Sequence, residues 1–180
     1  MHRRRLSRMT RSSPLVLLLG CAALSTSRPS DAQVAAQPVT VRISAQRDTT
    51  FTGAELARLP RSQIRVAASD HAGDSAHGQV LYEGVAVSDL LTLVGAPLGS
   101  ALRGRAVASY VLVEAADGYR VVFSLEEAGG RTPPTLLLAD RRNGEPLSPD
   151  EGPLRIIAPD ARHSRWIRQV VRISVRDAAP

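Results

Sequence analysis

Residues 112–130 read LVEAADGYRVVFSLEEAGG and carry three structural signals in one run. Alternating apolar segments at 106–115 and 119–123 flank Asp117-Gly118, a pair suited to a two-residue primed turn, so the pattern predicts a β-hairpin. Ser124 and Glu127 follow with the spacing of a capping box, which opens a helix. The stretch therefore predicts a hairpin that leads directly into a short helix.

The rest of the domain alternates between strand and turn signals. A capping box at Thr52 and Glu55 predicts a helix to Leu59, and Ser88-Asp89 is expected to cap a helix over 87–94. Gly84 is expected to end the strand before that second helix. Asn143-Gly144 marks another turn, and a polar loop covers 70–78. Period-two or buried apolar patterns predict further strands at 39–44, 63–68, 79–83, 135–138, 154–158 and 167–175.

Short helices among many strands, without regular βαβ alternation, favour a particular fold class. The expected class is α+β, with a mixed β-sheet or partly open barrel and short helices. A chain of 180 residues with 43% hydrophobic residues suits one globular domain plus extra sequence. Aromatic residues make up only 3%, so aliphatic side chains must fill the core.

The net charge of +6 does not indicate a nucleic-acid-binding protein. Six of the 23 basic residues lie in residues 1–32, where Asp31 is the sole acid, so the remainder is nearly neutral. Without a basic face there is no electrostatic footprint for DNA or RNA.

The N-terminal segment explains this asymmetry. A basic stretch followed by the apolar run PLVLLLGCAAL predicts an export signal over 1–32. Leu18-Leu19-Gly20-Cys21 also fits a bacterial lipoprotein box, with cleavage after Gly20 and a lipid anchor at Cys21; ordinary cleavage near Ser30-Asp31-Ala32 is the alternative. Residues 21–38 are expected to form a flexible tether, 39–176 the folded domain and 177–180 a tail. The predicted location is the periplasm or the lipid-anchored cell envelope.

Six motifs in their sequence order resemble one known family. They are Tyr82–Leu91, Ala116–Leu125, Leu138–Asp140, Asn143–Leu147, Gly152–Pro159 and Trp166–Val175. Together they resemble the oxidoreductase molybdopterin-binding domain, the fold of sulfite oxidase, over residues 39–176. The resemblance implies a sheet scaffold around a pterin whose dithiolene holds molybdenum, with a protein Cys thiolate as a further ligand.

This sequence departs from the family at the metal ligand. The ligating Cys would fall around Ile64–His71, but Cys21 is the only cysteine of the chain. Ala68 and Ser69 cannot replace a soft thiolate on molybdenum. No catalytic residue and no metal ligand is therefore predicted, and molybdopterin is expected only through the resemblance.

Asp70, His71 and Arg165 are the candidate cofactor-binding residues. Asp70 and His71 belong to the segment DHAGDSAH, which could coordinate a divalent cation or, as we favour, form a solvated polar loop. Arg165 precedes Trp166 where the resemblance places a basic contact to the pterin phosphate, because guanidinium binds phosphate bidentately. Trp166 is expected to anchor the core, and Glu126-Glu127 to cap a helix instead of serving acid–base chemistry.

Three functions remain open from the sequence. The first is a molybdopterin-binding oxidoreductase domain that depends on another ligand or on a redox partner. The second, which we favour, is an exported domain of this class without the Cys ligand and without independent catalysis. The third is a metal-free envelope lipoprotein that uses the fold to bind a small ligand or another protein, or that has a purely structural or assembly role.

Overall fold

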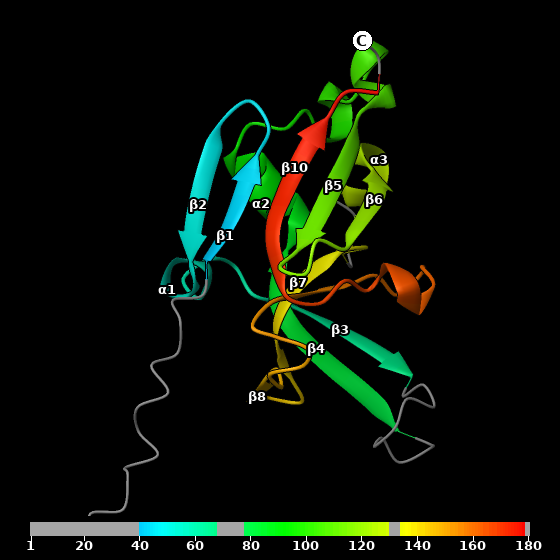
Figure 1. The fold of residues 1–180 in the computed structure, drawn as a ribbon. Helices are drawn as coiled ribbons and strands as arrows, with labels where there is room; N and C mark the ends of the chain where they lie inside the picture. The colour runs from blue at the N-terminus through cyan, green and yellow to red at the C-terminus, as the bar shows by residue number, and fades with distance from the viewer. Residues whose placement is uncertain (1–39, 68–77, 130–133, 179–180) are drawn as a thin grey trace, which may run out of the picture. The chain divides into compact units, whose positions relative to one another are not determined.

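The first strand of the domain, β1 (Thr40–Ser44), lies parallel to the last, β10 (Val170–Arg176), with Ile43 opposite Ile173 (Figure 1). The computed structural model describes residues 40–67, 78–129 and 134–178. All of these belong to one compact unit that spans residues 36–180. The two ends of this unit are therefore joined within one sheet.

Sheet A contains five strands in the order β2-β1-β10-β5-β6. Only the β1–β10 pair is parallel, and the other neighbours are antiparallel, so the sheet is mixed. Its remaining strands are β2 (Asp48–Thr52), β5 (Tyr110–Ala115) and β6 (Arg120–Ser124).

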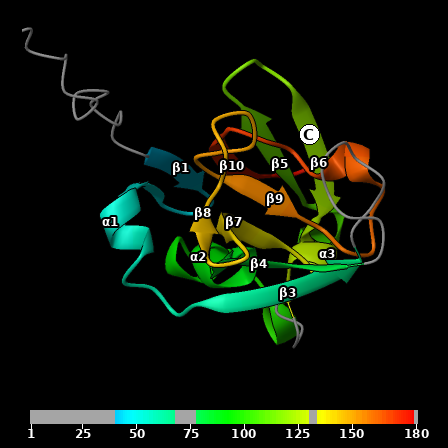
Figure 2. The same cartoon turned by 90° about the horizontal axis from the view of Figure 1, so that it is seen from below.

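Sheet B is antiparallel and runs in the order β3-β4-β7-β8, with β9 paired to β7 (Figure 2). The expected mixed-sheet α+β fold is confirmed, with two open sheets and no closed barrel among the described residues. The strands are β3 (Ser62–Ala67), β4 (Gln79–Ala86), β7 (Leu137–Arg142), β8 (Glu145–Pro146) and β9 (Arg155–Ile157).

Short helices connect the strands, and none in the described residues has the length and apolarity to cross a membrane. The α-helices are α1 (Gly53–Leu56), α2 (Val87–Leu93) and α3 (Leu125–Ala128). Single 3₁₀ turns form η2 (Gly99–Ala101), η3 (Gly104–Ala108) and η4 (His163–Arg165).

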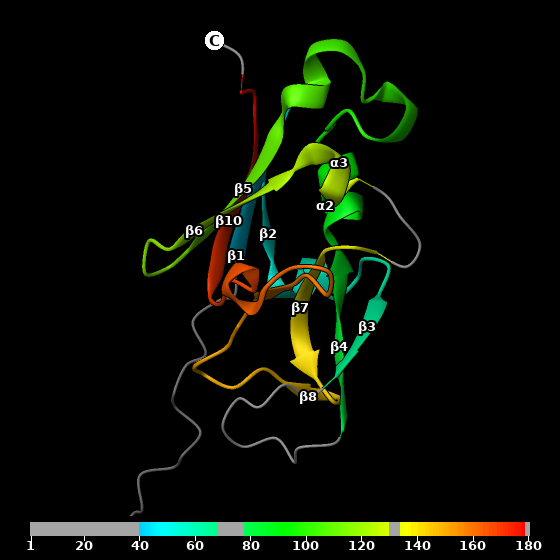
Figure 3. The same cartoon turned by 90° about the vertical axis from the view of Figure 1, so that its right-hand side faces the viewer.

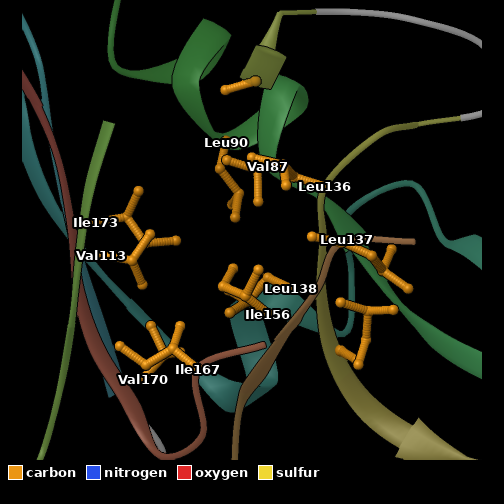
Figure 4. Close-up of a cluster of buried hydrophobic side chains, with 14 of the residues drawn as sticks. Val87, Leu90, Val113, Leu136, Leu137, Leu138, Ile156, Ile167, Val170 and Ile173 are labelled. Carbon is orange, nitrogen blue, oxygen red and sulfur yellow. The ribbon is translucent and has the colours of Figure 1, made fainter. Parts of the chain in front are cut away.

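The core lies between the two sheets, which Figure 3 shows as separate layers. Val113 and Ile173 from sheet A point toward Leu138 and Ile156 of sheet B, and Leu90 of α2 packs at one end (Figure 4). All five are at most 1% exposed. Each such aliphatic side chain contributes about 1.5–3 kcal/mol by leaving water.

Both predicted capping boxes are present. Thr52 and Glu55 bond reciprocally at the start of α1, and Ser124 and Glu127 do so at α3. Helix α1 ends at Leu56 and not at the expected Leu59. The cap predicted at Ser88-Asp89 is wrong, because α2 begins after Ala86, whose side chain makes no capping bond.

The turn at Asp117-Gly118 differs from the expected primed turn. Gly118 N donates to Ala115 O at 3.0 Å, and among these turn residues only Gly118 has a positive φ, of 85°. The hairpin therefore closes through a tight turn that ends in a glycine with left-handed backbone conformation, which is another common hairpin connection. The second turn has both Asn143 and Gly144 at positive φ, as a primed turn requires.

Gly84 does not end its strand, because β4 continues to Ala86. The register of β4 against β7 shifts at Glu83/Gly84. A Cβ on Gly84 would lie 2.0 Å from the carbonyl oxygen of Leu138. Glycine is required here because the backbones of β4 and β7 approach closely within the sheet. It does not mark the end of a strand.

Other strand limits also differ from expectation. Strand β2 was not predicted, residues 106–108 lie in η3 instead of a strand, and β7 extends beyond Leu138 to Arg142. Strand β10 begins at Val170 and not at the expected 167, and the strand is irregular between Val170 and Arg172, where Val171 is 43% exposed.

Candidate functional site

The segment 158–166, which follows β9 and contains η4, is held by one bond within itself and one bond from the residue before β6. Trp166 Nε1 donates to Ala158 O at 2.7 Å, which closes the segment on itself. Tyr119 Oη, just before β6, donates to Ser164 O at 3.0 Å. Trp166 is 6% exposed, so its expected role as a core anchor is confirmed. The segment is thus held rigidly beside the β5–β6 hairpin.

Trp166 also belongs to a cluster of rings around one guanidinium group. Tyr82 of β4 meets it edge to face, with ring centroids 6.1 Å apart and planes at 88°. The His163 ring centroid lies 4.4 Å from that of Trp166, with the planes at 42°. The Arg155 guanidinium carbon lies 6.0 Å from the Tyr82 ring and 5.8 Å from the Trp166 ring. Aromatic faces attract a cation at such distances.

Arg155 carries the positive charge of this cluster. The sequence did not identify it as a candidate residue. Its Nη1 pairs with Glu151, which also lies 3.6 Å from Arg142 Nη1. Its Nε is buried and has no hydrogen-bond partner in the described part of the chain. A buried N–H without an acceptor is costly, so this atom is a place where an anion would be stabilised.

Arg165, the predicted phosphate contact, contacts residues of β6 and α3. Its Nη1 donates to Glu127 Oε1 at 2.9 Å, and its Nη2 donates to Val122 O at 2.7 Å. The guanidinium carbon lies 4.2 Å from the centre of the Phe123 ring. Protein groups therefore already occupy these donors.

A hollow of about 530 Å³ adjoins this ion pair. Three of its lining residues are acids, namely Glu126, Glu127 and Asp160, and none of the described residues that line it is basic. Ser124 and Thr135 add hydroxyl groups. The electrostatic character of the hollow is thus negative, which disfavours anionic ligands.

The other two predicted contacts, Asp70 and His71, lie outside the described residues. Among those that are described, no group of three or more His, Cys, Asp or Glu side chains converges as metal ligands would. The structure therefore assembles Arg155, Tyr82 and Trp166 into one cluster and places Arg165 apart from it.

Comparisons with known proteins identify this architecture. A family model described as the oxidoreductase molybdopterin binding domain matches residues 27–180. Among solved structures, the sulfane dehydrogenase SoxCD from Paracoccus pantotrophus has a TM-score of 0.58 and 19% identity, covering 78% of this chain and 39% of that one. At that identity the likeness concerns the fold alone. A search of curated proteins gives no match.

The family match and the fold agree. The match spans both sheets, the aromatic cluster and the acidic hollow. A TM-score of 0.58 over 78% of this chain shows that the structural neighbour shares its fold. The chain belongs to the oxidoreductase molybdopterin binding domain family.

Proposed function

We propose that this chain is an exported member of its family that lacks the protein thiolate for molybdenum and does not catalyse a reaction by itself. One observation carries the proposal: Cys21 is the only cysteine, and it precedes the matched residues 27–180. The resemblance implies a protein thiolate on the molybdenum, and hydroxyl and imidazole groups do not offer such a soft sulfur donor. The matched domain offers no such side chain.

The described residues fit the family's cofactor only in part. The pterin ends in a phosphate, and the orphaned Nε of Arg155 is a donor that such an anion could satisfy. The hollow beside Glu127 does not fit, because carboxylates line it. An anionic group could therefore contact the aromatic cluster, while the chain contributes nothing that binds the metal itself.

The N-terminal sequence supports export. Residues 1–32 have the basic and apolar regions of a signal, and Leu18-Leu19-Gly20-Cys21 fits a lipoprotein box. We propose a periplasmic or lipid-anchored location, with a redox or envelope protein as partner.

A second candidate function is a metal-free lipoprotein that binds a small ligand or another envelope protein. The pairing of Arg165 with Glu127 favours it, because this basic side chain is already neutralised within the protein. Both candidates share the fold and the absent thiolate, and they differ in whether any pterin is bound.

The test is metal and pterin analysis of the full chain, purified from the envelope of a host that makes molybdopterin. The control is a family member with a Cys between the strands equivalent to β3 and β4, produced in the same cells. We expect background molybdenum in this protein and stoichiometric molybdenum in the control. Extractable pterin without metal would support the first candidate, and neither pterin nor metal the second. Stoichiometric molybdenum in this chain would overturn the proposal.

A further inference from the structure

Asn143 is the only asparagine of the chain, and a glycine follows it. The two residues form the exposed connection between β7 and β8, beside the Arg142–Glu145 pair (Figure 1). In an Asn-Gly pair the glycine nitrogen can give up its proton and bond to the Asn side-chain carbon, because glycine has no side chain to block the approach. The side-chain nitrogen then leaves as ammonia, and water opens the resulting five-membered imide to aspartate or isoaspartate. The local sequence therefore favours spontaneous modification.

The fold bonds the Asn143 side chain to the neighbouring strand β4. Asn143 N donates to Leu81 O at 2.7 Å, and Leu81 N donates to Asn143 Oδ1 at 2.9 Å. The side-chain amide thus takes the place of a backbone carbonyl, and it extends the β4–β7 ladder one position beyond the Tyr82–Arg142 pair. The amide that would react is therefore part of the hydrogen bonding of sheet B.

The backbone of this turn also opposes closure of the imide ring. Asn143 and Gly144 have φ of 52° and 85°, the pattern of a type I′ turn, in which ψ of the first residue is about +30°. The imide requires a ψ near that of the first corner of a type II′ turn, about −120°. Ring closure must therefore rotate the peptide bond between the two residues and turn Asn143 Cγ toward Gly144 N. The bond from Leu81 N to Oδ1 has to open before this can happen.

We infer that Asn143–Gly144 is a self-modifying site that the packing of β4 against the turn keeps unreactive, so that chains that remain unfolded are altered and folded chains are not. An aspartate product keeps an oxygen acceptor for Leu81 N. Isoaspartate instead adds a main-chain carbon to a two-residue turn, which breaks the register of Arg142 with Glu145. The isoaspartate product therefore prevents a chain that failed to fold from folding later.

The test compares the native protein with the same chain unfolded in guanidinium chloride, both at mildly alkaline pH, which favours loss of the Gly144 proton. Mass spectrometry of peptides prepared in acid measures the conversion of the Asn143 amide into an acid. Asn143→Ser is the control, because it has no side-chain amide to lose. Asp117-Gly118 can isomerise by the same route but gains no mass. We expect the native protein to react about tenfold or more slowly than the unfolded chain.

Hydrogen exchange of the Leu81 amide identifies the cause of the protection. If opening of its bond limits the reaction, moderate denaturant should raise Leu81 exchange and Asn143 modification by the same factor, within about twofold. Equal rates in native and unfolded protein would overturn the inference, as would slow modification that does not follow Leu81 exchange.

The two products provide a second test. After transfer to native buffer, the isoaspartate fraction should show no cooperative unfolding transition, whereas Asn143→Asp should unfold cooperatively. Cooperative unfolding of the isoaspartate fraction at the stability of the unaltered protein would overturn the effect assigned to it. None of these measurements depends on molybdenum or pterin, so a failure here is distinguishable from a failure of the proposed function.

Discussion

Arg42 on β1 and Asp48 on β2 form a two-pronged ion pair, with Arg42 Nε 2.8 Å from Asp48 Oδ1 and Nη2 bonded to Oδ2. The pair begins a row of charges that crosses all five strands of sheet A. Arg172 on β10 donates to Glu114 on β5 at 3.5 Å, and Glu114 accepts from Arg120 on β6 at 2.9 Å. Because exposed pairs are screened by water, the row favours the correct strand register more than it adds stability.

The Arg42–Asp48 pair predicts a loss of stability in acid. The hydrogen bond from Arg42 lowers the pKa of Asp48 below its ordinary value. Since the unfolded chain then binds the proton more tightly, the contribution of this group is present near neutral pH. It is lost as the pH falls below about 4, through the lowered pKa of the folded state. Urea unfolding between pH 5 and pH 2 should show a shallower decline for Asp48→Asn than for the unaltered protein.

Arg42→Gln checks the cause of that decline. It leaves Asp48 in place but removes the donor, so its acid profile should resemble that of Asp48→Asn. If both variants lost stability in acid as steeply as the unaltered protein, the Arg42–Asp48 pair would not be the cause of the decline.

Gly84→Ala should destabilise the protein strongly. The new methyl group would lie 2.0 Å from the Leu138 carbonyl oxygen, so β4 and β7 would have to separate. We expect a loss of about 3 kcal/mol or more, or failure to fold. Gly118→Ala is the control, because that site has open space and only its φ of 85° opposes a side chain. Its expected cost in urea unfolding is about 1 kcal/mol.

Gly84 and Gly118 show which parts of the fold could be predicted from local sequence patterns. Local patterns predicted both capping boxes and the hairpin, because each depends on residues a few positions apart. Gly84 was misinterpreted because its reason is a contact with Leu138, more than fifty positions away. Strand β2 (DTTFT) was missed because an edge strand of mostly polar, exposed residues lacks an apolar alternation.

The residues of the candidate site were likewise predicted only in part from the sequence. Arg165 and Trp166 were identified because they follow each other in a family-like motif. Arg155 was missed, although a charged residue between Leu154 and Ile156 in a buried strand was a signal of special pairing. Which rings surround it is a tertiary property, since Tyr82 and Trp166 lie far apart in the chain.

The Arg61–Asp140 pair should contribute measurably to stability. It joins the segment after α1 to β7 through two bonds of 2.8 and 2.5 Å, and both side chains are about 30% exposed. The hydrogen bond to Asp140 raises the pKa of Arg61. A double-mutant cycle with Arg61→Gln and Asp140→Asn should give a coupling of about 1 kcal/mol, reduced by partial exposure to solvent. A coupling near zero would show that the two groups act independently.

Trp166→Phe should cost more than Tyr119→Phe, although each removes one donor to a carbonyl of the segment 158–166. The Trp166 bond to Ala158 is buried, so its loss leaves an acceptor without a partner and costs about 1–3 kcal/mol. Tyr119 is 51% exposed, and water can replace its bond to Ser164, so about 0.5 kcal/mol is expected. Chemical unfolding followed by circular dichroism compares the two, and equal costs would refute the role of burial.

Cys21→Ala tests the proposed lipid anchor. If Cys21 is lipidated, intact-mass analysis of the envelope protein should show a diacylglyceryl-modified cysteine at the new N-terminus. The variant should lack this mass and leave the membrane fraction. Identical processing of both proteins near Ser30-Asp31-Ala32 would instead establish ordinary signal cleavage.

The position of β10 between β1 and β5 has a consequence for how the protein is made. A ribosome releases residues 170–176 after the other four strands of sheet A, yet this strand connects the β1–β2 hairpin to the β5–β6 hairpin. A nascent chain thus cannot complete sheet A, and long-range pairing of this kind forms slowly. Sheet A therefore stays incomplete until residues 170–176 have been synthesised, and removal of β10 would leave two unattached hairpins.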